Sequence, residues 1–267
     1  MNNLKKIGLT ALAGSLVATS VSFAGELSVS GAASMKLSNN SNSSAGKTVG
    51  MANSVNFAGS GELDNGMTVS MAFELDQGAG AGGGPFDNHS VSLSSDSMGT
   101  LTVHGHGGSN AASALDTTAA GDLWDNSLGL TTGAAGLAPK GAASGDNLVV
   151  YTLPELAEGM SVSASYASAG ENNEGSTAFG LTYTGMEGLT VKLGQGNNNG
   201  TVGVDIEQTV MSASYAIGSF TVGYSNNDYD HTTAANDQTT ESVSLAYTLS
   251  DSLSFSYGMT DIDNSGD

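Results

Sequence analysis

The sequence contains no cysteine and no arginine, only three prolines and a single tryptophan. Without cysteine there are no disulfides, so an exported domain of this size must be stabilised by a packed core or by lipid. After residue 24 no stretch approaches about 18 apolar residues, the length that a membrane-spanning helix needs. Helical periodicity is missing as well, so the open classes are a secreted all-β protein and a protein that crosses a membrane with strands.

The first 24 residues have the pattern of a secretory signal peptide. Lys5 and Lys6 precede an apolar stretch, 7–21, and Ser22-Phe23-Ala24 places small residues before a cut at Gly25. The apolar stretch is too short for a spanning helix. We therefore predict a signal peptide over 1–24 and one domain over 25–267.

Acidic residues dominate the charge of the exported chain. All 26 Asp and Glu remain after the cut, whereas the bases are Lys36, Lys47, Lys140 and Lys192. Removing Lys5 and Lys6 takes two positive charges from a formal charge of −20 and leaves −22. Nucleic acids and anionic lipid surfaces bind through basic contacts, so we expect neither as a partner. Cations are the favoured partners, and no cofactor is indicated.

Apolar and small residues alternate along most of the chain, with the period of two that is typical of a strand. In 67–76, for example, Met67, Val69 and Met71 alternate with Thr68 and Ser70. The strands after residue 145 repeat the pattern with Ser, Thr, Gly and Ala on the polar side. A soluble sheet usually turns Lys, Glu and Arg to bulk water, so this polar side favours a water-filled lumen.

Tyrosines stand near the ends of these strands, as they do in the aromatic girdle at a lipid interface. They are Tyr166, Tyr183, Tyr215, Tyr224, Tyr247 and Tyr257. A β-sandwich that uses these tyrosines in its core is the alternative.

Short and long connections alternate along the chain, as they do in an up-and-down transmembrane β-barrel. The expected long connections are 39–50, 78–88, 104–145, 168–176, 194–208 and 226–240. We count about thirteen antiparallel strands, and we expect 261–267 to be a loop.

The longest connection, His104–Gly145, interrupts a run of strands, and a loop of that length is usually functional or disordered. By strand parity the polar face carries Glu74, Asp76, Lys36, Lys192 and His104. His89 falls on the other face, so the sequence indicates no three-histidine metal site. The histidines stand near no convincing nucleophile or base, so it indicates no enzyme either.

Three stretches make the chain resemble the Gram-negative general porins, especially the alphaproteobacterial type. They are Met98-Gly-Thr-Leu-Thr-Val103, Asp146-Asn-Leu-Val-Val-Tyr151 with Pro154, and Gly159–Tyr166. The resemblance implies a 16-stranded homotrimeric barrel in the outer membrane, whose long third loop folds inward at 104–145. Such porins commonly place Arg near the positions of Gly105 and Val150, and this chain has none.

Because about thirteen of sixteen strands are found, we expect the chain to be truncated at its C-terminus. The function implied is passive diffusion of small hydrophilic solutes and ions, with cations preferred. The expected constriction carboxylates are Asp116, Asp122, Asp125 and Asp146. The alternative is a secreted, acidic, glycine-rich β-protein such as an adhesin or surface-layer module.

Overall fold

The computed structural model describes residues 26–39, 47–76, 86–112, 115, 146–169, 175–197, 203–250 and 253–264. Thirteen strands lie in these ranges, and their order in the sheet is their order in the chain. Every pair whose register is given is antiparallel. The expected all-β class and the count of about thirteen strands are therefore confirmed. Within the described ranges no helix is both long and apolar enough to cross a membrane.

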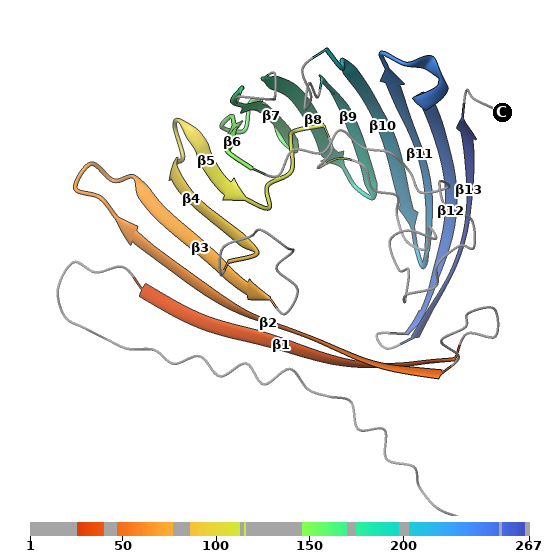
Figure 1. Ribbon diagram of the computed structural model, residues 1–267, viewed down its shortest axis with the longest axis horizontal. Helices are drawn as coiled ribbons and strands as arrows, with labels where there is room; N and C mark the ends of the chain where they lie inside the picture. The colour runs from red at the N-terminus through yellow and green to blue at the C-terminus, as the bar shows by residue number, and fades with distance from the viewer. Residues whose placement is uncertain are drawn as a thin grey trace, which may run out of the picture. The chain divides into compact units, whose positions relative to one another are not determined.

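The chain divides into two compact units at Leu93 and Ser94. Figure 1 labels the strands of both units. The first unit holds β1 (Glu26–Asn39), β2 (Lys47–Glu62), β3 (Thr68–Asp76) and most of β4 (Asn88–Ser95). The second unit holds β5 (Gly99–His106), β6 (Leu148–Thr152), β7 (Met160–Ala167), β8 (Ser176–Met186), β9 (Leu189–Asn197), β10 (Ile206–Ile217), β11 (Phe220–His231), β12 (Gln238–Ser250) and β13 (Leu253–Asn264). A short 3₁₀ helix, Ala234–Asn236, joins β11 to β12.

In the second unit the strands bury their polar face and expose their apolar face. We call the face with Ser165, Gly180 and Ser212 the inner face. Its residues in β10 and β12 include Gln208 and Gln238, each 1% exposed. On the opposite, outer face many apolar side chains are exposed. Those that are 40–67% exposed include Leu101, Tyr166, Phe179, Met211, Tyr215, Val222, Leu245 and Tyr257. This inverts the pattern of a soluble sheet and excludes a sandwich core built from those tyrosines, because their rings face outward.

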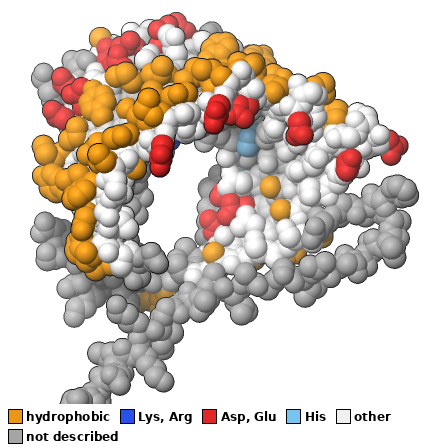
Figure 2. Space-filling view, turned by 180° about the vertical axis from the view of Figure 1, so that it is seen from behind, with side chains coloured by type: hydrophobic (Ala, Val, Ile, Leu, Met, Phe, Trp, Pro, Cys, Tyr) orange, Lys and Arg blue, Asp and Glu red, His pale blue; other side chains and the backbone are white. Residues whose placement is uncertain are grey.

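Large apolar and aromatic side chains continue across neighbouring strands of the outer face. Phe220 is paired with Tyr247, and Tyr247 with Phe255, in one row across β11, β12 and β13. The rings of Phe220 and Tyr247 have centroids 4.7 Å apart. Figure 2 shows hydrophobic side chains gathered in a broad band over the strands. Such a band is the surface that a strand-built membrane protein turns to lipid.

Several predicted loops were too long. The expected loop 194–208 lies partly in strands, since β9 runs to Asn197 and β10 begins at Ile206. Asn39 and Lys47 are paired at the end of the β1–β2 ladder, so the expected loop 39–50 lies partly in strands. β11 runs on to His231 and β12 begins at Gln238, which leaves 232–237 between them. Asp261–Asn264 belong to β13 rather than to a terminal loop.

The physical reason is the same in each case. Asp, Asn and Gly are depleted in strands in general, but here the ladder continues beyond the apolar band. In β11 the alternation persists, with Asn227 and Tyr229 buried and Asp228 and Asp230 exposed.

Candidate functional site

The first residues of the long segment after β5 lie on the inner face of the sheet. We call Asn110, Ala111, Ala112 and Leu115 the loop root; all four are buried, from 0% exposed at Ala112 to 8% at Leu115. The Ala111 backbone N–H donates to Ser165 Oγ of β7 at 2.9 Å. The Ala112 N–H donates to Asn110 Oδ1 at 2.9 Å, which closes a local turn. The expected inward fold of this loop is therefore confirmed for its root.

Two glycines of the wall make room for the loop root. Gly180 of β8 and Gly194 of β9 are directly paired, so the two positions without a side chain lie side by side. A Cβ on Gly180 would overlap the carbonyl oxygen of Ala111, and a Cβ on Gly194 would lie 3.0 Å from Ala112 Cα. The root thus packs backbone against backbone, which only glycine permits.

The neck of the long segment is formed by the end of β5 and the residues before β6. His106 Nδ1 and Asp146 Oδ1 lie in direct contact. The Asn147 N–H donates to the Gly105 carbonyl at 3.3 Å, and Asn147 adopts a left-handed φ of 53°. Since β5 extends to His106, the connection begins at Gly107 rather than at His104.

Farther along the sheet, amide side chains are hydrogen-bonded to each other on the inner face. Gln208 Nε2 donates to Asn227 Oδ1 at 2.7 Å, and Gln238 Nε2 donates to Asn264 Oδ1 at 2.9 Å. Buried amides need such partners, because an unpaired buried polar group is costly. These residues were missed from the sequence because Gln208, Asn227 and Gln238 had been assigned to loops.

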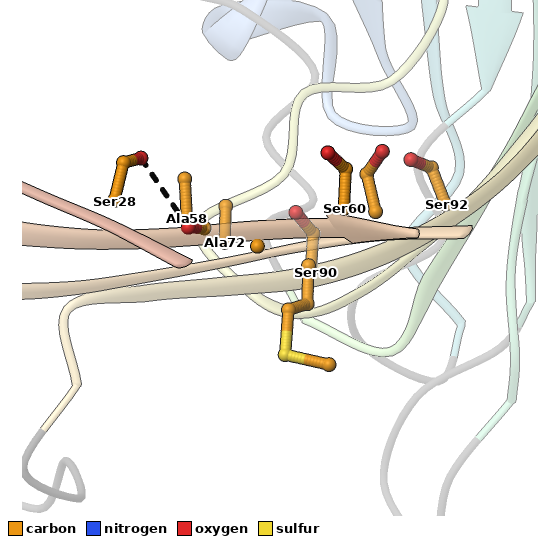
Figure 3. Close-up of a pocket in the computed structure, with 9 residues that line it drawn as sticks. Ser28, Ala58, Ser60, Ala72, Ser90 and Ser92 are labelled. Atoms are coloured by element: carbon orange, nitrogen blue, oxygen red, sulfur yellow. Dashed lines mark hydrogen bonds between the residues drawn. The ribbon is translucent and has the colours of Figure 1, made fainter. Parts of the chain in front are cut away.

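The first unit presents hydroxyl groups on one face of β1–β4. Ser28, Ser60, Ser70, Ser90 and Ser92 line a shallow hollow of about 410 Å³ together with Ala58 and Ala72. Figure 3 shows the labelled serine and alanine side chains rising from the same side of these strands. Ser28 Oγ donates to the Ala58 carbonyl at 3.3 Å. The opposite face is apolar and exposed, for example at Met35 and Met51.

The predicted lumen-facing residues were assigned by strand parity, and the register puts several of them on polar faces. Glu74 shares the face of Ser70 and Ala72 in β3, and its Oε2 accepts from Asn88 Nδ2 at 2.7 Å. Asp76 comes two residues after Glu74 and lies on the same face of β3. Lys192 is paired with Ser212, which lies on the inner face of the second unit.

The remaining predicted residues divide into those that the structure describes and those that it does not. His104 is paired with Leu148, and Leu148 with Ala167, which shares the inner face with Ser165. For Lys36 the structure describes only the backbone, which is paired with Gly50. Asp116, Asp122 and Asp125 lie outside the described residues, so the structure brings only Asp146 of the four predicted constriction carboxylates to the loop neck. In the described part of the chain no group of three or more His, Asp or Glu is arranged to hold a metal ion.

An antiparallel sheet with an apolar outer face, a polar inner face and an inward loop root defines the class of outer-membrane β-barrel channels. Comparison with protein-family models identifies the family within that class. The model of the Gram-negative porin family matches residues 8–267, and the chain belongs to that family. The protein is therefore located in the outer membrane. Among curated proteins, none matches the sequence significantly.

Solved porin structures share the fold at low sequence identity. A loop-deletion mutant of OmpT of Vibrio cholerae is 16% identical with a TM-score of 0.66, covering 90% of this chain and 82% of that chain. OmpF of Salmonella typhi, in complex with daunomycin, is 14% identical with a TM-score of 0.59, covering 89% and 79%. An anion-selective porin of Comamonas acidovorans is 15% identical with a TM-score of 0.53, covering 88% and 79%. At such identities the likeness concerns the fold, and ion preference must be argued from this chain's own residues.

Proposed function

We propose that this porin is a passive, water-filled channel for small hydrophilic solutes and ions, that it prefers cations, and that it assembles as a homotrimer. The observation that carries the proposal is the reversed burial of the sheet. The outer face exposes its apolar side chains, whereas the inner face is rich in serine, threonine, glycine and amide groups. Such a wall supports water and offers hydrogen bonds without a dedicated binding pocket. Passive diffusion needs no catalytic residue, so we propose no enzymatic activity.

The charge of the chain supports the cation preference. The chain has no arginine. It has 26 acidic residues and six lysines, and two of these lysines lie in the predicted signal peptide. The lysine on the described inner face is Lys192, and Asp146 stands at the loop neck. Fixed charge near the narrowest point governs ion selectivity, because bulk salt screens it least there. We place Asp116, Asp122 and Asp125 at that point, on the inward loop.

A structurally similar porin and the apolar outer face of this chain both support the proposed trimer. OmpT of Vibrio cholerae, 18% identical with a TM-score of 0.58, is described in a trimer form. The exposed apolar band of this chain offers area both for lipid and for a second subunit. Cross-linking of the protein in its native membrane would test this part, and a protein that stays monomeric there contradicts it.

Neutralising the loop carboxylates tests the constriction. Asp116, Asp122 and Asp125 changed together to Asn should lower the ratio of potassium to chloride permeability in a planar bilayer. The matched control is the triple change of Asp228, Asp230 and Asp237. Asp228 and Asp230 are exposed on the outer face near the end of β11, so the control should alter the ratio less. Equal effects of the two triple variants would contradict the assignment of the loop carboxylates.

A further inference from the structure

Two histidines stand at the neck of the long segment, on the inner face. His106 Nδ1 contacts Asp146 Oδ1, and their side chains are 45% and 58% exposed. His104 lies two residues earlier with the same parity. The chain folds back over its ring, since a Cβ on Gly108 would lie 2.6 Å from His104 Cγ. The histidines therefore adjoin the root of the inward loop.

Among the residues that the structure describes, few other titratable groups surround the pair. β6 carries Leu148, Val150 and Thr152 on the inner face, and β7 carries Ser163 and Ser165 there. The residues after His106 are Gly107, Gly108, Ser109 and Asn110. Among the described residues of these segments, Asp146 is the charged group that faces His106.

We propose that His104 and His106 determine selectivity in this channel and make its cation preference depend on pH. The proposal rests on the proposed cation-preferring function. The Asp146 carboxylate contributes negative charge to the neck. Histidine is the side chain whose charge changes most readily between pH 5 and 8, and a protonated imidazole carries one positive charge. Protonation of both imidazoles would change the formal charge of the three groups from −1 to +1.

The size of the effect follows from the solvent exposure of the pair. In water, a unit charge about 7 Å from a permeating ion contributes roughly one RT. Each added charge should therefore change the permeability of a cation about two- to threefold, and that of an anion in the opposite sense. Because the chain lacks arginine, these imidazoles supply positive charge to a wall that otherwise has little.

The experiment measures the ratio of potassium to chloride permeability in planar bilayers at pH 8 and at about pH 5.5, above the ordinary range of Asp and Glu. The unmodified channel should lose cation preference at the lower pH. The variant H104N/H106N should lose most of that pH dependence. H106Q, which changes only the histidine in contact with Asp146, serves as the second variant if the double change disturbs folding. H89N is the matched control, because His89 lies on the opposite face to Ser90 and Ser92, and it should behave like the unmodified channel.

The outcomes separate this proposal from the proposed function. A channel with no cation preference at pH 8 would contradict the proposed function. A cation-preferring channel whose ratio is the same at both pH values would overturn only the histidine proposal. So would an undiminished pH dependence in both H104N/H106N and H106Q.

Discussion

The contact between the loop root and the wall can be tested by adding one carbon atom. In G180A the new Cβ would overlap the Ala111 carbonyl oxygen and would lie 3.0 Å from Leu115 Cδ1 and 3.1 Å from Ser163 Oγ. Backbone atoms cannot rotate away, so the root must move by roughly 1 Å to restore ordinary contact distances. A shift of that size stretches the 2.9 Å hydrogen bond from the Ala111 N–H to Ser165 Oγ.

The cost can be estimated from two contributions. Overpacking a well-packed site costs about 1–3 kcal/mol. Losing one intramolecular hydrogen bond costs about 0.5–1.5 kcal/mol more. We therefore expect G180A to lower the free energy of unfolding by about 2–4 kcal/mol, measured by urea unfolding of the protein folded into lipid. We also expect a changed single-channel current, because the displaced root lies on the inner face.

Gly185 provides the matched control for this variant. It lies in the same strand, β8, but a Cβ there would meet the Glu158 carbonyl oxygen at 2.5 Å and not the loop root. G185A should therefore destabilise the wall while leaving the channel current close to that of the unmodified protein. The reasoning is refuted if G180A has unmodified stability and current, or if G185A alters the current as strongly.

Two further predictions concern the faces of the strands and one glycine turn. V222R should destabilise the lipid-folded protein by about 2–4 kcal/mol if residue 222 lies near mid-bilayer. T221R, one residue earlier on the inner face, should cost much less. Equal losses of stability in a lipid-folding assay would contradict the assignment of the faces. G99A should destabilise the protein more than G66A. Both glycines have φ near 80°, but only at Gly99 would a Cβ lie against backbone, 2.8 Å from Pro154 N. Equal shifts of the urea midpoint would show that the close approach at Gly99 is not a constraint.

Much of the fold follows from alternation alone. The sequence predicts which side chains of a strand share a face, and Met211, Val222 and Leu245 are indeed exposed on the outer face. Strand ends were harder to predict, because Asn227 and Asp228 have low strand propensity and extend a ladder that is fixed by its neighbours. The pattern therefore identifies the apolar band but not the length of strand beyond it.

The candidate site was less accessible from the sequence. The loop-root contact depends on Gly180 and Gly194 being opposite each other, and this needs the register of β8 against β9. The sequence feature that could have indicated it is a glycine at an inner-face position in each of two successive strands. Likewise, the contact of His106 with Asp146 joins residues forty positions apart in the sequence, and strand parity alone does not bring them together.

The central claim, a water-filled channel with a negative constriction, is tested most directly by the reversal potential of the unmodified protein in a planar bilayer under a potassium chloride gradient. Charge-based selectivity weakens as salt screens the fixed charges, since the Debye length falls from about 30 Å at 0.01 M to about 3 Å at 1 M. The account predicts a cation-preferring potential in dilute salt that shrinks in concentrated salt. An anion-preferring potential in dilute salt, or a membrane that stays non-conducting with the folded protein inserted, would contradict it.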